Sequence, residues 1–350
     1  MSGFISSIGM PEVVAGLMVL ALNAYVLMGG ADFGGGLWDL LASGPRRDAQ
    51  RALIADSIAP IWEANHVWLI VVVVVLFTGF PQAFGILGTV LHVPISLLLI
   101  GIVLRGSAFV FRSYGSRDRA RRESWGLAFA IASSVTPVLL GVIIGAVASG
   151  AVATAARQVG VASFTQVFVL PWFAPFPIVV GLFALALFAF LAAVYLTVVA
   201  TDDALREDFR RRALAMAGVV LVLAAVSLAL SFSAAPRIAS GVMGTSWSLA
   251  LHACTATAAV GAVVALWRRR YSVARVAAAA QISFILWGWA FSQYPFVIPS
   301  TLAIRDAAAP RLTLELLLIG LTVGALVLIP SLIYLFRTFA KPVSRATQSS

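Results

Sequence analysis

Nine apolar segments, most of them about twenty residues long or longer, follow one another along this chain of 350 residues. A helix needs roughly 20 apolar residues to cross the ~30 Å hydrocarbon core of a bilayer. Hydrophobic residues make up 61% of the chain and charged residues only 11%, against about 25% charged in soluble domains. The apolar runs are continuous rather than alternating. The sequence therefore predicts an all-α integral membrane protein.

The expected spans cover residues 12–35, 54–80, 83–104, 125–149, 174–200, 214–235, 247–267, 275–296 and 312–336. Arginine gathers in every second connection, and the run after the third span begins with Arg105 and includes Arg112. Cytoplasmic loops carry the excess of Lys and Arg, which predicts an outside N-terminus and a cytoplasmic C-terminus. The net charge of +10 is thus a topology signal, and no nucleic-acid partner is expected. Residues 1–340 form one membrane domain, and the tail 341–350 is expected to be disordered.

Ionisable side chains interrupt the second span. Asp56, Glu63 and His66 lie there together with Asn65, although each ionisable group at membrane depth costs roughly 2.5–3.5 kcal/mol. Spacings of seven and three residues are close to whole helical turns, so these side chains are expected on one face. Pro60 disturbs the turn that follows Asp56. The stripe indicates a proton relay; a buried network that only fixes helix packing is the alternative.

The first span ends in the glycine-rich motif GGADFGGGLWDLL, which holds Asp32. Glycines let membrane helices approach closely, so this motif indicates either close packing or the mouth of a proton path. His66, His92 and His252 raise haem ligation as a further alternative, which requires two imidazoles facing one another at matched depth. Cys254 is the sole cysteine, so disulfides and cysteine-based metal sites are excluded. No metal site is expected.

The motifs GADFGGGLWDLL and SIAPIWEANHVWLI resemble those of subunit II of cytochrome bd-type quinol oxidases. The resemblance continues in order through RGSAFVFRSY, SWGLAFAIASSVTPVLLGVIIG, YLTVVATDDALR and YPFVIPST. It implies nine helices in two four-helix bundles plus one peripheral helix, in the bacterial cytoplasmic membrane. It also implies a heterodimer with a subunit I that carries haem b, haem d and the quinol site, and it allows for a small single-span subunit.

The same resemblance implies that the complex oxidises quinol and reduces O2 to water with cytoplasmic protons. Membrane lipid and quinol are then partners, and some members hold a structural quinone in this subunit. The acidic residue of the proton path corresponds to Glu63, beside Trp62 and Asn65, and the acidic residue of the glycine-rich motif to Asp32. The chain itself is expected to be non-catalytic.

Further along the second span, Trp68 corresponds to a tryptophan beside a proposed oxygen route. The chain departs from the family pattern at two positions. Glu63 stands where many members have Asp, which preserves the carboxylate but moves it by a methylene. Val110 stands where an acidic residue is frequent, so the resemblance assigns this position no role in proton entry.

Two other functions fit the same polar residues. A stand-alone proton-coupled transporter would also place carboxylates at mid-depth, although the broken helix pairs of inverted repeats are not evident in the sequence. A structural scaffold for a haem-bearing partner would use the polar stripe for packing alone. The roles of Asp56 and His66 stay open between a proton path that includes Glu63 and Asp32 and a purely positioning function.

Overall fold

The structure, a computed structural model, describes residues 9–58, 62–112 and 118–339. Helices of eighteen residues or more form the body of the protein: α2 (Met10–Leu40), α4 (Trp62–Gly79), α6 (His92–Val110), α7 (Arg119–Ala148), α10 (Pro175–Val199), α11 (Asp203–Ala234), α13 (Ser248–Trp267), α14 (Tyr271–Gln293) and α16 (Arg311–Phe339). The shorter helices connect them: α3 (Arg47–Ile58), α5 (Pro81–Val90), α8 (Ala151–Arg157), α9 (Phe164–Phe168), α12 (Pro236–Gly244) and α15 (Ile304–Ala307). Two short strands, β1 (Phe296–Ile298) and β2 (Leu302–Ala303), pair antiparallel.

The prediction of a helical membrane protein is confirmed. Within the described ranges, eight helices are long and apolar enough to cross a membrane, and the number rises to nine if the bent pair α4 and α5 counts as one span. Seven of the nine expected spans lie largely within single long helices, although several of these helices extend well beyond the expected ends. The helix α11, for example, begins at Asp203, eleven residues before the expected start of its span.

The second and third expected spans differ from the helices observed. Residues 54–80 fall on parts of α3 and α4, and residues 59–61 between these helices lie outside the described part of the chain. The helix α5 then turns away from α4 by 115°, so the expected span 83–104 is divided between α5 and α6. Pro81 begins α5, where proline suits the first helical turn but cannot continue the preceding helix. The candidate span is α6 instead.

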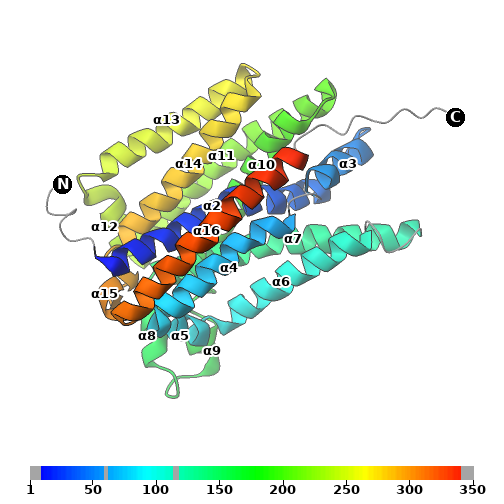
Figure 1. Ribbon diagram of the computed structural model, residues 1–350. Helices are drawn as coiled ribbons and strands as arrows, with labels where there is room; N and C mark the ends of the chain where they lie inside the picture. The colour runs from blue at the N-terminus through cyan, green and yellow to red at the C-terminus, as the bar shows by residue number, and fades with distance from the viewer. Residues whose placement is uncertain (1–8, 59–61, 113–117, 340–350) are drawn as a thin grey trace.

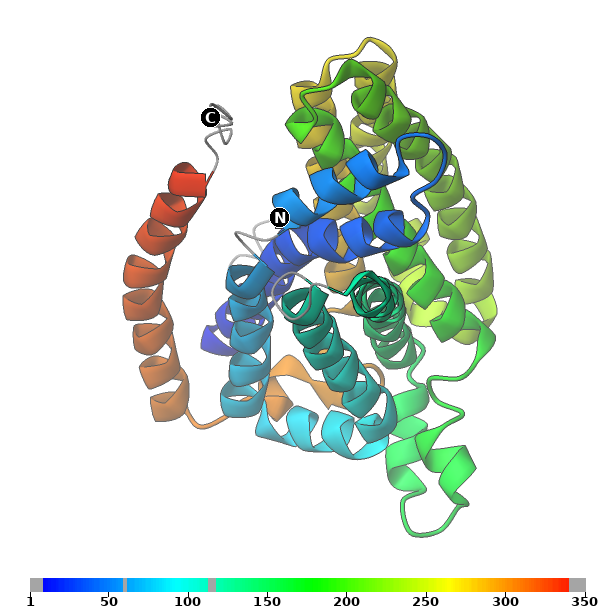
Figure 2. The same cartoon turned by 90° about the vertical axis from the view of Figure 1, so that its right-hand side faces the viewer.

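Helix α10 occupies the centre of the molecule. All nine residues from Ala186 to Val194 are buried, as expected of a helix surrounded on every side. It packs against α2, α7, α11 and α14, while α2 also contacts α4 and α7, and α6 contacts α7. The helix α16 contacts α4 and α2 but leaves most of its apolar surface exposed, and Figure 2 shows it at the edge of the molecule.

The two ends of the helices differ in charge. Figure 1 places the turns α2–α3, α10–α11 and α13–α14 at one end, which we call the basic end because it carries Arg46, Arg206 and the run Arg268 to Arg270. The short helices α5, α8, α9, α12 and α15 gather at the opposite end. The buried polar side chains of the interior lie between these two ends.

Candidate functional site

The glycine-rich motif brings α2 against its neighbours and buries Asp32. A Cβ atom added to Gly30 would lie 2.9 Å from the ring of Phe188 on α10. A Cβ on Gly34 would meet the backbone carbonyl of Phe188, and one on Gly36 would meet the side chain of Ser133 on α7. These contacts favour the close-packing interpretation of the motif, and the same packing leaves Asp32 only 4% exposed.

Asp32 is held by an amide from the second polar motif. The Nδ2 of Asn65 on α4 donates a hydrogen bond to the carboxylate of Asp32 and lies 3.4 Å from the carbonyl of Met28. Asn65 is fully buried, and its Oδ1 has no hydrogen-bond partner among the described residues. The structure therefore brings together two residues that the sequence places on separate candidate motifs.

Arg105 completes this group and corrects the sequence analysis. The sequence pattern places it in the basic connection after the third span, whereas α6 continues to Val110 and leaves Arg105 only 1% exposed. Its Nε donates to the hydroxyl of Ser133 over 3.1 Å, and its Cζ lies 4.5 Å from the centre of the Phe33 ring. Arg105 also interacts electrostatically with Asp32. The two side chains form no hydrogen bond or ion pair within the described part of the chain, so their attraction acts over a longer distance.

Two further titratable side chains surround the pair. Tyr25 is 1% exposed and interacts electrostatically with both Arg105 and Asp32. His66 on α4 is half-buried, and the centre of its ring lies 6.0 Å from that of Tyr25 and 5.9 Å from that of Phe33. We call this set the buried polar cluster and define it as Tyr25, Asp32, Asn65, His66, Arg105 and Ser133. It links α2, α4, α6 and α7 in the interior of the protein.

A second carboxylate on α2 is neutralised near the basic end. Asp39 is 1% exposed and accepts two hydrogen bonds from Arg112, over 2.9 and 3.1 Å. The sequence pattern also places Arg112 in the loop after the third span. In the structure, its side chain reaches the buried carboxylate of Asp39. The Nε of Arg51 lies 3.7 Å from the same carboxylate. Such two-pronged pairing is the strongest form of ion pair available to arginine, so Asp39 fixes the end of α2.

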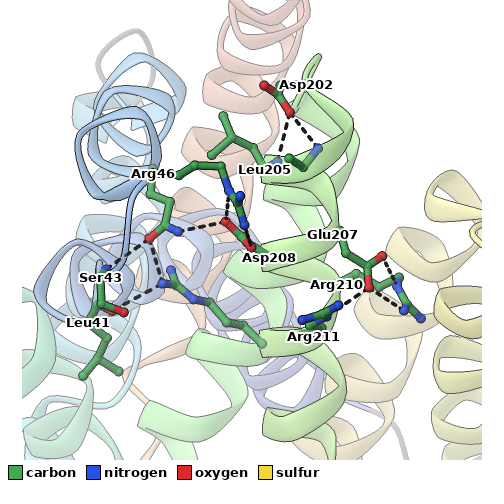
Figure 3. Close-up of polar contacts among 12 residues, drawn as sticks. Leu41, Ser43, Arg46, Asp202, Leu205, Glu207, Asp208, Arg210 and Arg211 are labelled. Carbon is green, nitrogen blue, oxygen red and sulfur yellow. Dashed lines mark hydrogen bonds and ion pairs between the residues drawn. The ribbon is translucent and has the colours of Figure 1, made fainter.

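Figure 3 shows how the basic end is tied together across α2, α3 and α11. Arg46 forms two hydrogen bonds with the carboxylate of Asp208, over 2.8 and 2.6 Å, and Gln50 donates a third. This bonding raises the pKa of the Arg46 guanidinium. Arg212 donates to Gln50 and to the carbonyl of Leu41. These hydrogen bonds hold the turn after α2 against α11, close to the exposed surface.

For the other predicted site residues, the structure gives fewer contacts. Glu63 and Trp62 begin α4, but their side chains lie outside the described part of the structure. Asp56 is exposed on α3, the helix that follows the α2–α3 turn at the basic end (Figure 1). Trp68 is half-buried on α4 and packs against the main core. The structure thus joins Asn65, Asp32 and His66, and leaves the contribution of Glu63 as a prediction.

The histidines do not form a pair suited to haem. His66 lies in the interior on α4 against Tyr25 and Phe33. His92 begins α6 at the opposite end, where its Nδ1 bonds to the carbonyl of Thr89. His252 lies on α13, which Figure 1 places far from α6. No group of three or more His, Cys, Asp or Glu that suits a metal ion is found among the residues described. Among the described residues, the three histidines therefore do not offer two facing imidazoles for haem.

The comparisons with known proteins agree on one family. A family model described as cytochrome bd terminal oxidase subunit II matches residues 10–339. The chain belongs to this family. The bd oxidase structure from Geobacillus thermodenitrificans superimposes with a TM-score of 0.77 over 94% of this chain and 98% of that one. Since those two chains are 23% identical, this likeness shows the shared fold.

Sequence relatives of this bd subunit II chain match over shorter stretches. Cytochrome bd-I ubiquinol oxidase subunit 2 of Escherichia coli (strain K12) is 30% identical over 134 residues, which cover 38% of this chain and 35% of that protein. A putative cytochrome bd menaquinol oxidase subunit II of Bacillus subtilis (strain 168) is 29% identical over 118 residues, 34% of each chain. The matched stretch thus spans about a third of the length of each relative.

The fold and the family together make this bd subunit II chain a multi-pass bacterial membrane protein. Sequence reasoning missed Arg105, Tyr25 and Ser133 as members of its buried polar cluster. The sequence does contain a sign that Arg105 is buried, because the apolar run SAFVF follows it and the helix continues to Val110. Tyr25 and Ser133 gave no signal, since a single polar side chain in a long apolar segment does not indicate which neighbour it faces.

Proposed function

We propose that the chain is subunit II of a quinol:O2 oxidoreductase complex, paired with a haem-bearing subunit I in the bacterial cytoplasmic membrane. The complex oxidises quinol and reduces O2 to water, with haem b and haem d in the partner. This chain is not catalytic by itself and supplies protons from the cytoplasmic side. Its nine-span topology puts the N-terminus outside and the basic end in the cytoplasm, as the positive-inside rule requires.

One observation carries the proton-path proposal. Asp32 is an ionisable group buried within the membrane-spanning region, in a cluster with Asn65 and Arg105. Ionisable residues at this depth are costly and mark ion or proton pathways when they face the protein interior. Asn65 donates a hydrogen bond to the carboxylate of Asp32, and Arg105 interacts with it electrostatically. This arrangement can accept a proton without leaving a carboxylate unpaired.

The proposed path runs from the basic end towards the partner. Asp56 is exposed on α3, the helix that follows the turn at that end, and Glu63 begins α4 two residues before Asn65. His66 lies one residue after Asn65 and beside Tyr25 and Phe33. In the proposed sequence, Asp56 collects protons, Glu63 passes them inward, and Asp32 exchanges them in the interior beside His66. Trp68 packs beside this route, and the resemblance assigns Trp62 to the same region of the sequence.

Replacing Glu63 by alanine is expected to lower quinol-dependent oxygen uptake while the complex still assembles. The change removes the proton carrier at the start of α4 and leaves Asp32 and Arg105 in place. Oxygen consumption is measured on purified complex and normalised to the haem absorbance of the partner. Asp48→Asn, which alters an exposed carboxylate on α3, is the control. Unchanged uptake by assembled Glu63→Ala complex would remove Glu63 from the path.

Replacing Asp32 by asparagine is expected to lower the same uptake by about tenfold or more, because the buried group can no longer exchange a proton. Asparagine preserves the shape of the side chain and the contact with Asn65. The measurement includes a solvent isotope effect in D2O, which rises if proton delivery limits turnover. If Asp32→Asn lowers only the yield of complex and leaves the uptake per haem unchanged, Asp32 is a packing residue.

The family assignment does not favour a stand-alone transporter. The Glu63 and Asp32 variants also distinguish a structural scaffold from a proton path. If the chain is only a scaffold, the variants lower the amount of assembled complex but not the oxygen uptake of each assembled complex. Copurification of a haem-bearing partner with this chain tests the proposal of a heterodimer. A chain isolated without haem that moves solute into liposomes would contradict it.

A further inference from the structure

An apolar groove runs between α13 and α14, away from the buried polar cluster. It has a volume of about 780 Å³. Figure 1 shows these two helices side by side along one edge of the molecule, joined at the basic end. The residues that line the groove include Cys254, Thr257 and Ala258 on α13 and Val276, Ala280 and Phe284 on α14. The small side chains on both helices open the groove.

The length of the groove corresponds to one leaflet of a bilayer. Along α14 its lining extends from Ser272, one residue into the helix, to Phe284. Twelve residues of helix rise about 18 Å, and half of the hydrocarbon core is roughly 15 Å. The groove therefore begins where the helices enter the membrane at the basic end and stops near the midplane. This extent suits the acyl chain of a lipid in that leaflet.

A polar cavity of about 480 Å³ lies at the mouth of the groove and shares Ser272 and Val273 with it. Its lining adds Arg206, Arg269 and Arg270 around Tyr271. The groove and this cavity are therefore adjacent: an apolar groove of leaflet length has a pocket lined by three arginines at its end. A molecule that fills both has an extended apolar part and an anionic head.

The charges at the mouth are balanced only in part by the protein. Arg206 is engaged with Asp203 at 2.7 Å and lies over the ring of Tyr271. The carboxylate of Glu207 is shared by two arginines of its own helix, as Figure 3 shows, and Arg269 reaches it only at 3.5 Å. Arg269 remains 67% exposed, and exposed Arg270 has no ion pair within the described part of the chain.

We propose that the groove and the adjacent cavity together bind one anionic phospholipid, with its phosphate on Arg269 and Arg270 and an acyl chain in the groove between α13 and α14. Guanidinium groups match phosphate oxygens in pairs. Basic pockets between membrane helices at the cytoplasmic side bind anionic head groups. The shared residues Ser272 and Val273 join the head-group pocket to the apolar groove. The site is independent of the proton path and of the identity of the partner.

The test is a titration of the purified, delipidated complex with phosphatidylglycerol or phosphatidylcholine, followed by native mass spectrometry. One phosphatidylglycerol is expected to remain bound under conditions that remove phosphatidylcholine. The double variant Arg269→Gln/Arg270→Gln should weaken phosphatidylglycerol by about fivefold per charge, and so on the order of 25-fold in all. The control Arg121→Gln/Arg122→Gln removes two exposed arginines of α7 at the same end and should leave this affinity unchanged.

A second variant separates the groove from the head-group pocket. Val276 is 66% exposed, so Val276→Trp fills the groove without disturbing the core and should also weaken phosphatidylglycerol. Equal binding of the two lipids, or wild-type affinity in the double arginine variant, would overturn the proposal. Displacement of the lipid by millimolar inorganic phosphate, or full affinity in Val276→Trp, would show that the pocket binds phosphate without the groove and would equally overturn it.

Discussion

Replacing Arg105 by glutamine is expected to destabilise the protein by about 3 kcal/mol, because it removes a buried hydrogen bond to Ser133 and the cation that offsets the buried carboxylate of Asp32. Arg105 is 1% exposed, and Asp32 is its electrostatic partner in the interior. Without the guanidinium, the carboxylate of Asp32 is left in the protein interior with Asn65 as its hydrogen-bond donor. The loss of the cation over the rings of Phe33 and Phe129 adds to the effect.

The measurement is the thermal midpoint of the assembled complex, followed by size-exclusion chromatography after heating. A loss of this size should lower the midpoint by several degrees. Arg121→Gln is the matched control, because Arg121 is 76% exposed and pairs only loosely with Asp118, at 3.8 Å. That variant should stay within about 0.5 kcal/mol of the parent.

The double variant Asp32→Asn/Arg105→Gln separates charge pairing from proton transfer. Removing both charges takes away the unpaired group, so the double variant is expected to be more stable than Arg105→Gln alone. Its oxygen uptake should nevertheless stay as low as that of Asp32→Asn, because the titratable carboxylate is still missing. A double variant as unstable as the sum of the two single variants would show that the charges do not interact.

The helices could be predicted from the sequence because the hydrophobicity of successive residues adds up over each long apolar segment. Long apolar runs identified seven of the eight helices that suit a membrane, and the composition of the first span indicated that Asp32 lies inside. The sequence indicates a connection at residues 81–82, but it does not predict that the helix after the 115° bend ends at Val90 or that the next long helix begins at His92. A sequence gives the apolar length of a segment but not its direction.

The site was predictable only in part, because its members meet through tertiary packing. Asn65 and Asp32 stood out as polar residues in apolar motifs, and the structure joins them. The sequence predicts that Arg105 lies in a cytoplasmic loop, since arginines that follow an apolar run usually lie at the membrane surface. Its burial follows from the apolar residues after it and from Ser133 on α7. The proton role of Glu63, Asp56 and His66 stays a prediction.

Replacing Gly34 by alanine is expected to prevent α2 from packing against α10, with a loss of about 3 kcal/mol or more, at or above the upper end of overpacking effects. The added Cβ would collide with the backbone carbonyl of Phe188 and would lie 2.8 Å from the Cβ of Ala192. A side chain can rotate away from such a contact, but the main chain of a helix buried on every side cannot. The expected observation is a marked loss of assembled complex in the membrane fraction.

Gly16→Ala is the matched control for this prediction. Gly16 lies on the same helix, and no atom of its neighbours lies within 4 Å of the added Cβ, so this variant should assemble at least as well as the parent. Because Gly34 is two residues from Asp32, the comparison also tests whether helix packing sets the position of the carboxylate. Any Gly34→Ala complex that does assemble should show lowered oxygen uptake per haem. Normal assembly and normal uptake would contradict the close approach of α2 and α10 and, with it, the placement of Asp32 in the buried polar cluster.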